Sequence, residues 1–180
     1  RTEVHLHIGR TLVAGMTADE IDAHLFDVAN QFNRGGALLT DPDEKARVAG
    51  INLRAGRKAK ASVAYASACG YLTAGMALFD DADWNSRYEL LFGLWLECAE
   101  CELLRGHFDT AERLIATLLR TATSKLDRAA AYRLKVDLHT IKAENTQAIE
   151  SVLACLRGLG IDLPAHPTQD QVQNEYEQVW

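Results

Sequence analysis

The stretch that decides the fold spans residues 88–115 and reads YELLFGLWLECAECELLRGHFDTAERLI. Its apolar residues recur at steps of three or four, which is the period of an α-helix with one buried face. Gly106 interrupts this period where a helix end favours a left-handed residue, and a second helical period follows it. Residues 88–115 are therefore predicted to form two helices joined by a short turn.

Helices are predicted over the rest of the chain as well. Their starts are marked by residues that can cap a helix N-terminus. These starts are Thr17 with Glu20, Asp41 with Pro42, and Thr168 with Gln171. No segment of the sequence alternates apolar and polar residues over a strand length with turn residues on both sides. The sequence predicts an all-α fold of about nine helices.

The turn at Gly106 resembles the second half of a tetratricopeptide repeat. In that motif a glycine closes the first helix, an aromatic residue follows two positions later, and a small residue comes three positions further on. Phe108 and Ala111 fill these positions, and the same frame fits two other stretches, the last more weakly because Asn145 replaces the aromatic residue. The predicted repeat-packing residues are Gly56, Tyr65, Ala68, Trp95, Ala99, Gly106, Phe108, Ala111 and Ala148.

The predicted architecture is an α-solenoid, a right-handed stack of about four tetratricopeptide-like hairpins that form a single helical-repeat domain. The approximate hairpins are residues 1–38, 41–80, 83–122 and 124–160, followed by an unpaired helix at 168–180. Because the sequence opens on Arg1 and its last helix lacks a partner, we expect the chain to be a fragment of a longer protein.

Composition excludes several classes of protein. Of the 180 residues, 48% are hydrophobic and 24% are charged, a balance that is neither disordered nor membrane-spanning. The formal net charge of -6 argues against nucleic acid or an anionic membrane surface as the main partner. We expect a cytoplasmic protein without membrane insertion, in which the four cysteines are reduced.

Four stretches resemble one family of very large bacterial signalling proteins. They are HLHIGRTLVAG at 5–15, residues 21–79, residues 88–115 quoted above, and GIDLPAHPTQDQV at 160–172. The most specific marker is NLRAGRKAKAS at 52–62. Members of that family combine a serine/threonine-kinase-like domain, an AAA-type predicted ATPase, a long tetratricopeptide-like helical region, a GAF domain and often a sensor histidine kinase. The resemblance covers essentially the whole chain and maps it to the start of the helical region, just after the ATPase.

The resemblance implies a non-catalytic module for protein interaction and signal relay, which couples the ATPase region to sensor and kinase domains. None of the family's catalytic motifs lies in this sequence. No catalytic residue, metal or cofactor is therefore expected here, and ATP is implied only for other domains of a parent that resembles a serine/threonine or histidine kinase. The expected partner is another domain of the same chain, or a separate protein or peptide.

Two other functions were weighed against signal relay. A helical domain that senses a small ligand is the alternative, by analogy with helical regions that follow ATPases in transcriptional activators. That function predicts a closed pocket among the aromatic residues and a saturable thermal shift with a metabolite. An enzyme in its own right is not supported, because no set of Ser, His and Asp can be assembled from the sequence spacing.

Candidate interaction residues fall into two sets. The first is the dense basic run Arg54, Arg57, Lys58 and Lys60. This run is either a docking patch for an acidic segment or a phosphate, or a solvated helix face paired with acids such as Glu44 or those at 80–83. The second set consists of exposed first-helix positions on a predicted concave face. Besides Arg54, these are Asn52, Glu97, Glu102, Arg133 and Asp137.

Cysteine and histidine patterns give weaker signals. Cys98 and Cys101 form a CxxC, but a zinc site would need two more ligands and a redox site would need a lowered thiol pKa. We therefore expect both thiols to pack in the core. His5, His7 and His24 could meet if the first helices form a hairpin, yet no acid accompanies them at ligand spacing.

Overall fold

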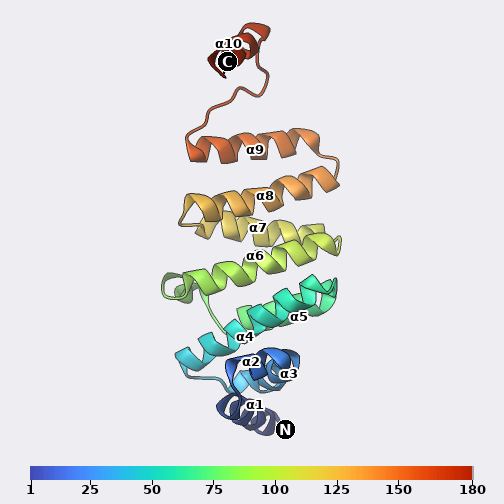
Figure 1. Ribbon diagram of the computed structural model, residues 1–180, viewed down its shortest axis with the longest axis vertical. Helices are drawn as coiled ribbons and strands as arrows, with labels where there is room; N and C mark the ends of the chain where they lie inside the picture. Colours follow the sequence, from blue (N-terminus) through green and yellow to red (C-terminus); the bar gives the residue numbers. More distant parts are fainter. Residues whose placement is uncertain (180) are drawn as a thin grey trace. The chain divides into compact units, whose positions relative to one another are not determined.

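The computed structural model of the chain describes residues 1–179, and every regular element in that range is helical (Figure 1). The all-α prediction is confirmed, with ten α-helices in the described residues where about nine were expected. Position 180 of the predicted last helix lies outside the described residues. Over the same range, no helix combines the length and hydropathy of a membrane span. The elements are α1 (Thr2–Gly15), α2 (Ala18–Ala23), α3 (Leu25–Gly35), η1 (Gly36–Leu38), α4 (Pro42–Ala61), α5 (Tyr65–Met76), η2 (Asp81–Asn85), α6 (Tyr88–Leu104), α7 (Phe108–Thr121), α8 (Lys125–Ile141), α9 (Asn145–Leu159) and α10 (Gln169–Val179).

Local capping determines where the predicted helices start. At α2 the Glu20 amide donates to Thr17 Oγ1 at 3.3 Å, while the Thr17 amide donates to Glu20 Oε2 at 2.8 Å. At α4 the Glu44 amide donates to Asp41 Oδ1 at 2.7 Å. Thr168 caps α10 in the same reciprocal manner as Thr17 caps α2. These three predicted starts are confirmed, because short-range hydrogen bonds satisfy amides that a helix leaves unpaired.

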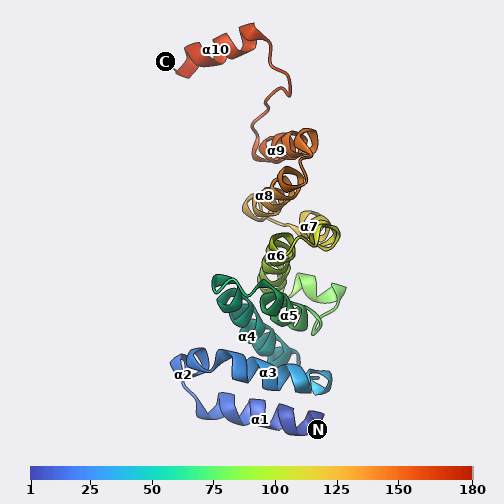
Figure 2. The same ribbon diagram turned by 90° about the vertical axis from the view of Figure 1, so that its right-hand side faces the viewer.

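The chain divides into two compact units, each built from paired helices. The first unit, Arg1–Thr121, holds α1 to α7, and the second begins at Ala122. In the first unit α1 packs on α3, α4 on α5 and α6 on α7, and α4 and α5 both contact α6. In the second unit α8 packs on α9 (Figure 2). The segment predicted as a hairpin at residues 1–38 contains a third helix, α2, between its two long ones.

The hairpins α4–α5, α6–α7 and α8–α9 share one turn. In each, three residues separate the helices, and the middle residue is left-handed, with φ of 61° at Val63, 76° at Gly106 and 58° at Ala143. The amide of the next residue donates to the carbonyl five residues earlier, at 2.9, 2.9 and 2.8 Å respectively. The predicted helix stop at Gly106 is confirmed, whereas Val63 and Ala143 adopt a conformation that costs a side chain about 1–2 kcal/mol.

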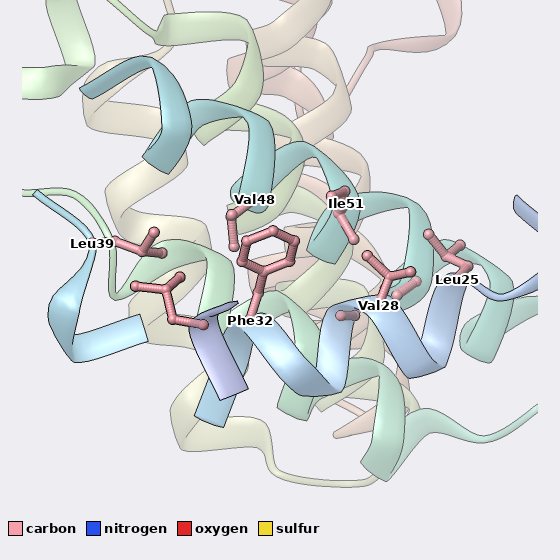
Figure 3. Packing of buried hydrophobic residues seen from close by; sticks show 9 residues of the cluster. Leu25, Val28, Phe32, Leu39, Val48 and Ile51 are labelled. Atoms are coloured by element: carbon pink, nitrogen blue, oxygen red, sulfur yellow. The ribbon is translucent and has the colours of Figure 1, made fainter. Parts of the chain in front are cut away.

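The first hydrophobic core joins α1, α3 and α4. Phe32 of α3 is 2% exposed and directs its ring toward Val48 of α4, which is 1% exposed (Figure 3). Leu6 of α1 belongs to the same cluster. The remaining members are Leu25, Val28, Ala29, Leu39, Ile51 and Ala55.

The second core joins α4, α5 and α6 through close approaches at glycine. A Cβ placed on Gly56 of α4 would lie 2.6 Å from Cγ of Leu72 on α5. A Cβ on Gly75 of α5 would lie 2.9 Å from Cδ2 of Leu94 on α6. Atoms do not approach this closely in packed interiors, so these helices reach their present spacing because both positions lack a side chain. Around them lie Ala49, Ala59, Ala68, Cys69, Cys98 and Cys101.

Two glycine substitutions within α4 test this packing. We expect Gly56→Ala to lower the free energy of unfolding by about 1–3 kcal/mol, because its methyl group overlaps Leu72. Gly50→Ala is the matched control, since a Cβ there meets nothing within 4 Å, and it should raise the same free energy by about 0.5–1 kcal/mol. Urea denaturation followed by circular dichroism measures both. Equal stabilisation by the two substitutions would show that α4 and α5 are not in close contact.

Candidate interaction surfaces and a buried thiol cluster

Two residues of the predicted basic run hold α4 to the helices before it. Arg54 forms an ion pair with Asp22 of α2. The Lys58 ammonium donates to the Asp22 carbonyl at 2.9 Å and lies 5.6 Å from the ring centroid of Phe26 on α3, within cation–π range. The charges of Arg54 and Lys58 therefore interact with other residues of the same chain. A role for the run in docking a partner remains a prediction.

The other two basic residues join α4 to α6, and we call this set of Arg57, Lys60, Glu97 and Glu100 the α4–α6 seam. Arg57 Nε donates to Glu97 Oε1 at 2.8 Å, and Lys60 Nζ donates to Glu100 Oε2 at 2.7 Å and also pairs with Glu97. Burial of Lys60 opposes its charge, yet the hydrogen bonds to Glu100 and Glu97 outweigh that cost and raise the pKa of Lys60. The seam is thus a partly desolvated network of charges.

The acids that pair with the basic run are not the ones the sequence suggested. Glu44 accepts instead from Nε and Nη2 of Arg10, each at 2.7 Å, and so joins α4 to α1. That bidentate bond is the largest cause of the lowered pKa of Glu44. Residues far apart in sequence supply the partners, which is why spacing along α4 did not identify them.

The predicted concave-face residues include two that are buried. Asn52 is 0% exposed and Glu102 is 8% exposed, so the expectation of exposure is wrong for both. Asn52 and Asn33 each donate from Nδ2 to the other's Oδ1 at 2.8 Å, and this amide pair satisfies Asn52 between α3 and α4. Arg133 and Asp137 of α8 do have exposed side chains, at 53% and 46%, and Arg133 Nη1 donates to Asp137 Oδ2 at 3.3 Å.

Arg133 and Asp137 line a groove between α8 and α9, which we call the α8–α9 groove. Its volume is about 260 Å³. The remaining walls are mainly apolar, and they consist of Ala129, Tyr132 and Val136 from α8 with Val152, Cys155 and Leu156 from α9. Pockets that enclose drug-sized ligands usually measure about 300–1,000 Å³. At about 260 Å³, the α8–α9 groove lies just below that range.

Apart from Gly106, which is exposed in its turn, the predicted repeat-packing residues occupy the interior or its edge. Tyr65, Trp95 and Phe108 are half-buried, and the Trp95 ring lies 5.3 Å from that of Trp84 in an edge-on contact. The alanines are fully buried or nearly so: Ala68, Ala99 and Ala111 are 0% exposed and Ala148 is 9% exposed. Ala68 belongs to the second core, and Trp95 packs against that core.

Cys98 lies in the core as expected, but the structure adds two neighbours that the CxxC pattern did not indicate. The sulfurs of Cys69 on α5 and Cys98 on α6 and a carboxylate oxygen of Glu102 all lie within 4.8 Å of one another. Burial, with Cys69 nearby, raises the pKa of Cys98 to about 12. Burial likewise raises the pKa of Cys101 to about 12. Burial therefore favours the protonated form of both thiols, whereas nucleophilic redox cysteines have lowered pKa values.

Polar side chains surround Glu102 at the end of α6. Arg105 Nη1 donates to its two carboxylate oxygens at 3.0 and 3.2 Å, and His107 Nδ1 lies 2.7 Å from Oε2. Arg105 also interacts with the Cys69 thiol. The meeting of three histidines that the sequence allowed is not formed in the described residues. Across residues 1–179, His5, His7 and His24 do not converge as a set of metal ligands.

Comparison with known proteins gives one distant similarity. No family model matches the chain, and no solved structure matches it. The chain is 24% identical over 200 residues to a Dictyostelium discoideum protein named "Hybrid signal transduction histidine kinase G". The match covers 98% of this chain but 6% of that protein. The chain is thus similar, almost from end to end, to one small segment of a very long signalling protein.

A pair of methionine substitutions tests the α4–α6 seam. We expect Lys60→Met to lower the free energy of unfolding by about 1–3 kcal/mol, because it leaves two partly buried carboxylates without their shared cation. The control is Arg54→Met, whose ion pair is largely exposed and should be worth about 0–1 kcal/mol. Chemical denaturation at neutral pH gives both values. Equal losses would mean that the seam is no stronger than an ordinary surface ion pair.

The raised thiol pKa values predict a loss of stability in alkali. The pKa of the Cys98 thiol is about 12 in the folded chain and 9.0 in the unfolded chain. Between these pH values the thiol keeps its proton in the folded chain and loses it when the chain unfolds. The contribution of this thiol to the free energy of unfolding is therefore fully present below about pH 9, and it is lost as pH rises toward about 12. Under reducing conditions, the melting temperature of Cys98→Ala should fall less steeply above about pH 9 than that of Cys155→Ala, the control outside the cluster. If the melting temperatures of the two variants fell in parallel above about pH 9, the raised pKa of Cys98 would be contradicted.

Proposed function

We propose that this chain is a non-catalytic, tetratricopeptide-like module that relays signals through protein contacts within a multidomain signalling kinase. The three equivalent hairpin turns and the buried alanines beside them support a repeated unit. Repeated helical hairpins hold surface side chains in fixed positions, which suits the recognition of an extended partner. The right-handed stack of about four hairpins is part of the proposal.

The observation that carries this proposal is the similarity of nearly the whole chain to a segment of a hybrid histidine kinase. The segment is a small part of that protein's length, as expected for one module among many. We propose that in the parent of this chain the module follows an ATPase region, connects it to sensor and kinase domains, and works in the cytoplasm. The nucleotide chemistry then belongs to other domains, and this module contributes binding surfaces.

The α8–α9 groove is the surface we propose for the partner. It offers apolar walls and the exposed pair Arg133 and Asp137, which together can orient a segment from another domain of the same chain. A partner segment carrying one charged residue beside two or three apolar ones fits this chemistry. The overall charge of -6 makes a nucleic acid a poor competitor for the groove.

A charge reversal in the groove tests the proposal. Segments encoded on either side of this chain in its gene are produced separately, and their binding to the chain is measured by calorimetry. We expect Arg133→Glu to weaken binding at least about tenfold, or about 1.4 kcal/mol, because it places a second negative charge beside Asp137. The matched control is Lys125→Glu, an exposed lysine in the first turn of α8, which should bind as the unchanged chain does.

Other outcomes separate the two functions. The gene should encode an ATPase upstream, and a GAF or histidine-kinase domain downstream. Equal binding by both variants, with helicity unchanged, would remove the groove from the proposal. Failure of every flanking segment to bind, together with a saturable thermal shift from a small molecule, would replace signal relay with ligand sensing.

A further inference from the structure

We propose that Cys69, Cys98 and Glu102 form a binding site for a zinc ion. The sequence alone led us to expect no metal here, because Cys98 and Cys101 lacked partners at ligand spacing. The fold supplies those partners, since α5 brings Cys69 to Cys98 and the next turn of α6 brings Glu102. This inference concerns the interior of the first unit and is independent of the proposed relay function.

The positions of the three ligand atoms support a single ion. They lie within 4.8 Å of one another. Two sulfurs bound to one tetrahedral zinc are roughly 3.8 Å apart, given zinc–sulfur bonds of about 2.3 Å. The distance between the two sulfurs must therefore shorten by about 1 Å or less for both to bind one zinc ion. Rotation of the cysteine side chains can supply this change. Three protein ligands leave the fourth tetrahedral position to water.

The charges around the site suit a bound cation with two thiolates. Zinc binding displaces one proton from each thiol into solvent, and the resulting group of Zn²⁺, two thiolates and one carboxylate carries a net charge of minus one. The Arg105 guanidinium, which contacts Glu102 and the Cys69 sulfur, offsets that charge. The two thiols and the Glu102 carboxylate are buried beside a largely apolar core, whereas Arg105 is an exposed residue that reaches the carboxylate from outside.

Neighbouring side chains already orient the ligands. His107 Nδ1 lies 2.7 Å from Glu102 Oε2, and Thr73 Oγ1 lies 3.9 Å from the Cys98 sulfur. Such hydrogen bonds to ligand atoms fix their direction and are typical of metal sites in proteins. The left-handed turn at Gly106 brings His107 back to Glu102, so the turn of the hairpin itself builds this support.

The ligand set favours zinc over other common ions. Calcium and magnesium prefer sites made only of oxygen atoms. A mixed set of two thiolates and one carboxylate matches zinc, which accepts both sulfur and oxygen ligands. Because Cys69 belongs to α5 and Cys98 to α6, the ion would cross-link two successive hairpins.

Metal titration of the untagged, reduced chain is the test. We expect one Co²⁺ per chain, with thiolate-to-cobalt charge transfer and the visible bands of a tetrahedral ion, displacement of Co²⁺ by Zn²⁺, and release of about two protons per zinc. Zinc should also raise the melting temperature, because only the folded chain holds the site together.

Variants assign the ligands. Cys69→Ser and Cys98→Ser should each weaken zinc binding at least about tenfold, as should Glu102→Gln, which keeps the shape of the side chain. Cys155→Ser is the control in the other unit and should bind zinc as the unchanged chain does. Circular dichroism confirms that each variant is helical. X-ray absorption of the zinc-loaded, unchanged chain needs no variant and should show two sulfur ligands with oxygen.

Three results would overturn the site. They are the absence of stoichiometric metal binding, full affinity in the double variant of Cys69→Ser and Cys98→Ser, and a zinc coordination shell without sulfur.

Discussion

The close approach of α4, α5 and α6 is the constraint on which the rest of the first unit depends. Gly75 lies where the three helices meet: a Cβ there would be 2.9 Å from Leu94 Cδ2 and 3.2 Å from Asn52 Cβ. Removing side-chain bulk at such points lets helix backbones come together, at the cost of helix propensity. The resulting spacing decides whether Lys60 can reach Glu97 and Glu100, and whether Cys69 can reach Cys98.

Local signals in the sequence predicted the helices and their ends well, because the interactions that determine them are local. Thr17, Asp41 and Thr168 bond to amides within the next three residues, and Gly106 adopts the left-handed conformation that glycine tolerates. The equivalent turns at Val63 and Ala143 carried no such signal. There the tertiary packing of the hairpins outweighs the preference of an alanine or a β-branched residue, which no propensity argument could have shown.

The candidate sites were harder to predict, because a helical period assigns residues to faces and not to neighbours. A polar residue on a first helix is expected to be exposed, yet Asn52 is buried and Asn33 satisfies its amide inside the first unit. The basic run is evident in the sequence, but its acidic partners Asp22 and Glu97 come from other helices. Cys69 had no nearby cysteine in sequence, so only the contact between α5 and α6 brings it to Cys98.

Helix α6 connects these features, and this gives the relay proposal a physical basis. Glu97 and Glu100 bind α4 through charge, while Cys98 and Glu102 face Cys69 on α5. Both contacts depend on the same helix axis, so a shift of α6 large enough to break one must disturb the other. Packed interiors yield in discrete steps and not continuously. A signal that reaches the first unit through α6 would therefore move the α4–α6 seam and the thiol cluster together, as a module that transmits a change of state requires.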